Sequence, residues 1–150
     1  MPDLSRAEAE PLIAVAKILR GDIDLKPRKN HAGYLLAIVR PEDELGATLP
    51  GMTVEVETKA PLVIDACRTT ATLFVLRHGV KWRVHQIEVQ PQHRRTHNGP
   101  SGPIYGPHEH RGDETLRLVE SLSCQTPLDE LFALFCKRSN ISFDGSIFIS

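Results

Sequence analysis

The chain has 150 residues, a formal net charge of -1, 41% hydrophobic residues and 25% charged residues. These values are ordinary for a globular protein without repeats or low-complexity segments, and they predict a single domain over residues 1–150. The longest apolar run, residues 34–39, is too short to span a bilayer, and the opening MPDLSRAEAE lacks the apolar core of a secretory signal. We therefore expect a cytoplasmic protein without a membrane partner.

The first predicted element is a helix. Ser5 and Glu8 have the spacing of a capping box, and Gly21 is a natural stop, with apolar residues at helical spacing between them: Leu12, Ala16 and Leu19. Pro11 conflicts with a continuous helix, because proline removes one backbone hydrogen bond. The helix is therefore expected to kink at Pro11 or to begin near Glu10.

Strands are predicted through the middle of the chain. The apolar run 34–40 indicates a buried strand, and residues 43–51 a loop. Residues 52–57 alternate between apolar and polar, as in a half-exposed strand. After Pro61, strand character resumes at 62–64, and a hairpin is predicted from segments 70–76 and 82–89, joined by a turn at His78-Gly79.

The C-terminal third is predicted to hold a second helix. Residues 116–122 fit either a helix or an edge strand. Thr126 is expected to cap a helix over residues 127–137, whose apolar stripe is Leu128, Leu131, Phe132 and Phe135. Residues 142–149 are expected to form a small hairpin around Asp144-Gly145. Together these elements predict an α+β fold, with N- and C-terminal helices packed on an antiparallel sheet of about five strands.

Three cysteines, Cys67, Cys124 and Cys136, occur without a C-x-x-C pair. An odd number with this spacing argues against a disulfide framework and against a zinc ribbon. We expect buried free thiols.

Residues 85–111 hold five of the seven histidines: His85, His93, His97, His108 and His110. The many Gly and Pro residues of this segment predict a long loop, and loops often carry functional side chains. In an extended stretch, His108 and His110 point to one face and Glu109 to the other. From residue 77 to 111, six Lys/Arg and two acids give a charge of +4 and leave -5 for the remainder, which predicts a positive surface for an anion.

Three functions are compatible with this segment. The first is metal-independent acid and base catalysis on RNA, in which one imidazole takes the proton of a 2′-hydroxyl and the other protonates the leaving oxygen. The second is a metal site of H-x-H and H-x-x-x-H ligands. The third is a non-catalytic protein, for example from a phage or mobile element, that binds nucleic acid, a nucleotide or a host defence factor.

The predicted catalytic residues are His108, His110 and His97. A role in phosphate or nucleic-acid binding is predicted for Arg94, Arg95, Arg111, Asn98 and Tyr105. We expect no cofactor, because no carboxylate or cysteine lies at regular ligand spacing. In addition, Glu109 points away from the histidines and provides no acceptor for their second nitrogens.

Four stretches in chain order resemble an uncharacterised family of small bacterial and phage-borne proteins: LSRAEAEPLIAVAK, an H-x-x-x-H-N-G-P segment, GPHEH and TPLDELFALFC. Members of that family have an N-terminal helix with an A-E-A pattern, then strands, an N-x-x-G loop, a P-H-x-H element and a C-terminal helix ending in a cysteine. After His110 the segment RGDETLRL differs from the aromatic strand of the family.

Some members of this family lie beside toxin and antitoxin genes. The resemblance therefore implies a toxin nuclease, with an antitoxin or a host protein as a partner. Carried over position by position, it points to His97, Asn98, His108 and His110.

Overall fold

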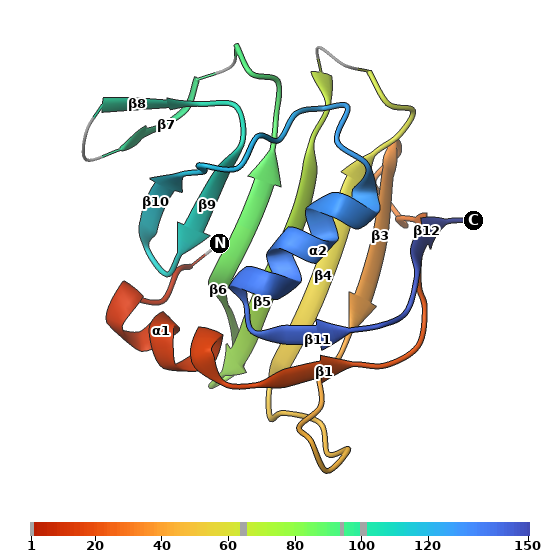
Figure 1. Cartoon of the computed structure of the whole chain (residues 1–150), viewed down its shortest axis with the longest axis vertical. Helices are drawn as coiled ribbons and strands as arrows, with labels where there is room; N and C mark the ends of the chain where they lie inside the picture. The colour runs from red at the N-terminus through yellow and green to blue at the C-terminus, as the bar shows by residue number, and fades with distance from the viewer. Residues whose placement is uncertain (1, 64–65, 94, 100–101) are drawn as a thin grey trace.

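The computed structural model describes residues 2–63, 66–93, 95–99 and 102–150, and for residues 95–99 it describes the backbone alone. Its main feature is an eight-stranded sheet of order β10-β9-β6-β5-β4-β3-β2-β12 (Figure 1). In chain order these strands are β2 (Ile23–Pro27), β3 (Tyr34–Val39), β4 (Met52–Lys59), β5 (Thr69–Arg77), β6 (Val80–Val89), β9 (His108–Arg111), β10 (Glu114–Arg117) and β12 (Ile147–Ile149).

The predicted fold class is wrong, because the protein is mostly β and its main sheet is larger and mixed. Neighbouring strands from β2 to β10 pair antiparallel, whereas β12 pairs parallel with β2. The central strands were correctly located by their apolar and alternating patterns, including the β5–β6 hairpin. Residues 62 and 63 lie outside any strand, and residue 64 lies outside the described residues.

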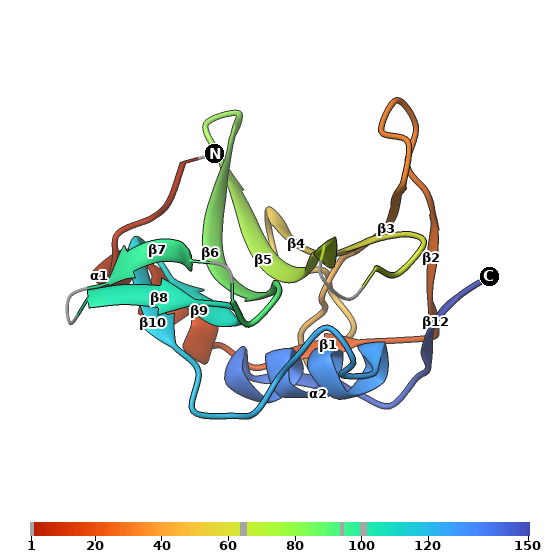
Figure 2. The same cartoon turned by 90° about the horizontal axis from the view of Figure 1, so that it is seen from above.

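The two helices are α1 (Arg6–Ala14) and α2 (Leu128–Arg138). Figures 1 and 2 show α2 lying across one face of the sheet, while the turns between β2 and β3 and between β5 and β6 project away from it. Buried side chains of α2 and of the sheet form one core; among them are Leu131, Phe132, Phe135, Val54, Leu73 and Ile87. No helix in the described part of the chain is long and apolar enough to cross a membrane.

The capping box predicted for α1 is confirmed, since the Ser5 side chain accepts from the Glu8 backbone and Glu8 bonds back to the Ser5 backbone. The helix contains Pro11 and ends at Ala14, earlier than its apolar spacing predicted. Residues beyond it form the strand β1 (Lys17–Leu19). In α2 the predicted cap is wrong, because Thr126 Oγ1 accepts from the Ser123 backbone and Pro127 is the residue preceding the helix.

The predicted hairpin over residues 142–149 is also wrong. Its two pieces separate: β11 (Ile141–Phe143) pairs parallel with β1, and β12 pairs parallel with β2. Between them, a Cβ added at Gly145 would lie 2.3 Å from the carbonyl oxygen of Gly21. Pairing with the N-terminal strands therefore replaces the local pairing that Asp144-Gly145 suggested.

The segment 85–111 is not a single long loop. Its described residues include the second half of β6, the two-stranded pair β7 (Arg95–Gly99) and β8 (Gly102–Tyr105), and then β9 in the main sheet. The β7–β8 hairpin lies at the β9–β10 end of the molecule (Figures 1 and 2). Residues 118–122 have no regular structure, so the segment 116–122 forms neither the helix nor the edge strand that its pattern allowed; the edge strand β10 ends at Arg117.

The prediction of three free thiols is wrong for two of them. Cys67 and Cys124, 57 residues apart, form a disulfide, while Cys136 is free and buried in α2. The segment that leads into α2 brings Cys124 to the beginning of β5. Sequence spacing cannot reveal such a long-range contact.

Candidate functional site

The strands β6 and β9 bring three titratable side chains together on one face of the sheet. In the antiparallel register His108 lies opposite Glu88, and His110 lies opposite Gln86. Because side chains alternate along a strand, Glu88, His108 and His110 share the face opposite that of Glu109. We refer to Glu88, His108 and His110 as the Glu88 centre.

The atoms of the Glu88 centre converge closely. Nε2 of His108 lies 3.1 Å from Nε2 of His110 and 3.2 Å from Oε1 of Glu88, and Nε2 of His110 lies 4.0 Å from the same oxygen. All three residues are buried: His108 is 0% exposed, His110 is 2% exposed and Glu88 is 5% exposed. In the described part of the chain, they are the one group of histidine, cysteine and acid side chains spaced to hold a metal ion.

Neighbouring groups orient each member of the centre. Nδ1 of His108 lies 3.0 Å from the carbonyl oxygen of Gly106, and Nδ1 of His110 lies 3.2 Å from Oγ1 of Thr115. Arg68 and Gln90 both donate to Oε2 of Glu88. Burial would raise the pKa of Glu88, but hydrogen bonds from His108 and Arg68 outweigh it and hold that pKa far below its usual range.

A second buried network occupies the opposite face of the same strands. His85 bonds through Nδ1 to Oγ of Ser139 and through Nε2 to Glu109, each at 2.5 Å. Glu109 also accepts two bonds from Arg138. Burial lowers the pKa of His85, and although burial would also raise the pKa of Glu109, its partners His85 and Arg138 hold it at about 2.

This second network has the composition of a Ser-His-acid triad, but its setting is structural. Ser139 and His85 are both 0% exposed, and Phe135 stacks on the His85 ring. Its donors and acceptors are complementary, since neutral His85 donates to Glu109 and accepts from Ser139. A substrate has no access to Ser139, so we assign this network to the packing of α2 on the sheet.

The structure confirms the shared face of His108 and His110 and the opposite direction of Glu109, but it places the pair on a buried strand. Arg111 lies on the Glu109 face, ion-paired with Glu10. Tyr105 is half exposed on β8. The backbones of Arg95, His97 and Asn98 lie in β7, whereas Arg94 lies outside the described residues. The functional roles predicted for these residues stay predictions.

The basic segment 77–111 is partly neutralised by contacts that sequence spacing does not reveal. Lys81 pairs with Glu55 and Arg83 pairs with Asp3, besides the Arg111 pair with Glu10. The acids come from β4 and from the N-terminal region, so they do not appear in a local count of charge. The net charge of this surface is therefore lower than +4.

Glu88 was missed as a member of the site. Its alternation with Ile87 on β6 and the H-x-H spacing of β9 were both visible in the sequence. The missing information was that β6 and β9 are neighbours, with Glu88 opposite His108. Glu88 on β6 thus provides a carboxylate to the histidines of β9, although no carboxylate lies at regular ligand spacing in the sequence.

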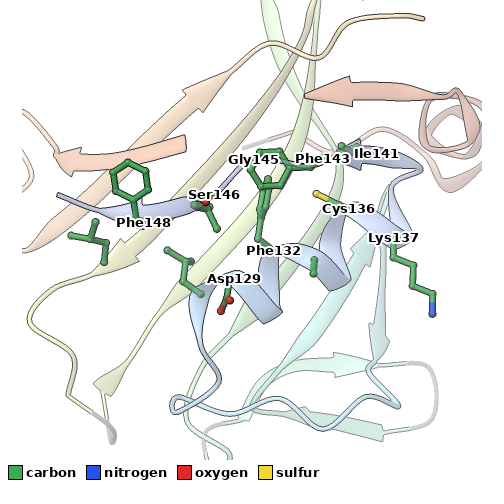
Figure 3. Close-up of a pocket in the computed structure, with 13 residues that line it drawn as sticks. Asp129, Phe132, Cys136, Lys137, Ile141, Phe143, Gly145, Ser146 and Phe148 are labelled. Atoms are coloured by element: carbon green, nitrogen blue, oxygen red, sulfur yellow. The ribbon is translucent and has the colours of Figure 1, made fainter. Parts of the chain in front are cut away.

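A separate pocket of about 710 Å³ lies between α2 and the β11 and β12 strands (Figure 3). Phe132, Phe143 and Phe148 contribute to its wall, together with Cys136. Burial raises the pKa of the Cys136 thiol to about 12, so this sulfur is not a nucleophile near neutral pH. The pocket shares no lining residue with the Glu88 centre.

Comparison of the chain with protein-family models, with curated proteins and with solved structures found no match.

Proposed function

We propose that this protein cleaves phosphodiester bonds in RNA at the Glu88 centre. The observation that supports the proposal is the convergence of two imidazole nitrogens and a carboxylate oxygen within 4.0 Å. Imidazole is the usual group for proton transfer near neutral pH, and RNA carries its own nucleophile in the 2′-hydroxyl.

The surroundings of the centre are compatible with a phosphate substrate. Arg68 donates to Glu88, and its own side chain is 46% exposed, so its guanidinium is available at the surface. Guanidinium groups bind phosphate through paired hydrogen bonds. Further basic and polar residues of the proposed substrate site are Arg95, His97 and Asn98 of β7, with Arg94 just before them.

The burial of His108 and His110 adds a condition to the proposal. A 2′-hydroxyl must come within about 3.2 Å of an imidazole nitrogen to transfer its proton. Local opening around β9, of the kind that exposes buried groups on the microsecond to second timescale, is therefore part of the proposal.

The test is cleavage of RNA by the purified protein. His108→Ala, His110→Ala and Glu88→Gln are each expected to lower the rate by roughly 100-fold or more. His31→Ala is the matched control, because His31 is exposed in a turn far along the chain from the centre. Absence of cleavage, or full activity in His108→Ala, would contradict the proposal.

A second candidate is a non-catalytic binding protein, which the complete burial of His108 favours. Its partner would be nucleic acid, a host protein or an antitoxin. In that case growth arrest on expression, if it occurs, should weaken gradually with substitutions over many surface residues. Relief of growth arrest by His108→Ala alone, in a folded protein, favours the enzyme.

A further inference from the structure

A neighbouring carbonyl determines which ring nitrogen of His108 donates a hydrogen bond. The carbonyl oxygen of Gly106 can only accept a hydrogen bond, so Nδ1 of His108 carries a hydrogen. In a neutral ring, Nε2 then presents a lone pair to Oε1 of Glu88, 3.2 Å away. Two lone pairs at this separation repel each other unless a proton or a metal ion lies between them. A proton on Nε2 gives the hydrogen bond from His108 to Glu88, and a metal ion would replace that hydrogen bond.

We propose that the Glu88 centre binds one divalent transition-metal ion through Oε1 of Glu88 and Nε2 of His108 and His110. This inference rests on the proposed function in its choice of site, and it assigns both Nε2 atoms as ligands, so a centre that holds the ion does not use these two atoms for proton transfer. A shared proton would join two atoms, whereas three atoms point to a common position here.

The separations of the three atoms fit such an ion. With bonds of about 2.1 Å and angles between those of an octahedron and a tetrahedron, neighbouring ligand atoms lie roughly 3.0 to 3.4 Å apart. The separations of 3.1 and 3.2 Å around His108 fall in this range. The third separation, 4.0 Å between His110 and Glu88, is longer than this range, so the inference requires these two side chains to move closer together when the ion binds.

Each ligand has the outer partner that metal sites normally provide. Ligating histidines usually donate their second ring nitrogen to an oxygen, which fixes the ring and directs the free nitrogen to the metal. The carbonyl of Gly106 has this position for His108, and Oγ1 of Thr115 has it for His110. Arg68 and Gln90 hold Oε2 of Glu88, which leaves Oε1 for the ion.

The two observations that favoured a metal-free centre therefore do not exclude a metal ion. A carboxylate is supplied by β6, outside the histidine pair, and the acceptors for the imidazoles are Gly106 and Thr115 in place of Glu109. Metal independence itself stays a prediction that the experiment below decides.

The donor set indicates the class of metal and its chemistry. Two imidazoles and one carboxylate suit zinc, iron(II), cobalt(II) or manganese(II), and do not suit soft ions that prefer thiolates. Three protein ligands leave a coordination position open, as in catalytic sites. The ion and Glu88 together carry a charge of +1 and Arg68 adds another, so an anionic ligand such as hydroxide or a phosphate oxygen is favoured in that position.

The experiment uses tag-free wild-type protein that has been treated with EDTA and then dialysed. Titration with Zn²⁺ by calorimetry is expected to show one ion per chain, and Co²⁺ should give visible absorption bands of a bound ion. Glu88→Gln and His108→Ala should weaken binding by 100-fold or more. Thr115→Val, which removes an outer partner and no ligand, should weaken it by about 10 to 100-fold. Glu42→Gln is the matched control, because Glu42 pairs with Arg20 in the connection between β3 and β4.

Failure of the folded wild-type protein to bind either ion at millimolar concentration would overturn the inference, and so would unchanged affinity in Glu88→Gln. These outcomes are independent of the proposed function. Stoichiometric binding without RNA cleavage refutes the proposed substrate and keeps the metal site. RNA cleavage by protein that binds neither ion refutes the metal site and keeps the proposed function.

Discussion

Lys17 is a buried cation that donates to backbone carbonyl oxygens. It is 1% exposed, and its Nζ donates to the carbonyl oxygens of Ile13, Val15 and Ser139 at 2.7 to 2.9 Å. These carbonyls belong to the ends of α1 and α2, where backbone acceptors lack partners within the helix. One side chain therefore satisfies both helix ends, while burial lowers its pKa to about 8.

The lowered pKa of Lys17 predicts an unusual pH dependence of stability. Between about pH 8 and 10.5 the unfolded chain keeps the Lys17 proton and the folded chain loses it, so the free energy of unfolding should rise with pH in this window, by roughly 1–3 kcal/mol. Urea unfolding at several pH values measures the rise. Lys17→Met should remove it, and Lys26→Met, at an exposed position, should keep it. Equal slopes in wild type and Lys17→Met would contradict the assignment.

At the scale of elements, the sequence correctly predicted the features that depend on residues close together in the chain. The alternation in β4 and the apolar stripe of α2 correspond to buried positions in the structure. The hairpin β7–β8 was missed because its Gly and Pro residues resemble a loop. The Glu88 centre was found only in part, since its histidines share one strand whereas Glu88 joins them through strand pairing that the sequence does not specify.

Phe132 is expected to be a large contributor to the packing of α2. It is 1% exposed and contacts the rings of Phe135 and Phe143. Phe132→Ala should lower the free energy of unfolding by about 3 to 5 kcal/mol, because it leaves a cavity in the core. Thermal or urea unfolding measures the loss. Glu130→Ala, an exposed change in the same helix, should alter it by less than about 0.5 kcal/mol.

At the scale of the whole molecule, the disulfide between Cys67 and Cys124 ties the start of β5 to the segment before α2. A cross-link that closes a loop of this size restricts the unfolded chain and should stabilise the fold by roughly 2–4 kcal/mol. The variant with both Cys67→Ser and Cys124→Ser should unfold at correspondingly lower urea concentration. Dithiothreitol should lower the stability of the wild type and leave that variant unchanged; an equal response of both proteins would contradict a native disulfide.

The parallel pairs β1–β11 and β2–β12 join the two ends of the described chain. During synthesis on a ribosome, β1 and β2 emerge first and their parallel partners emerge much later. The apolar side chains of Leu19 and Ile23 therefore lack their final neighbours while the middle of the protein is being made. Such distant pairing also slows folding, because the chain must close long loops before it gains the contacts. The antiparallel middle of the sheet is thus expected to form first, with both ends docking onto it as a late and coupled step.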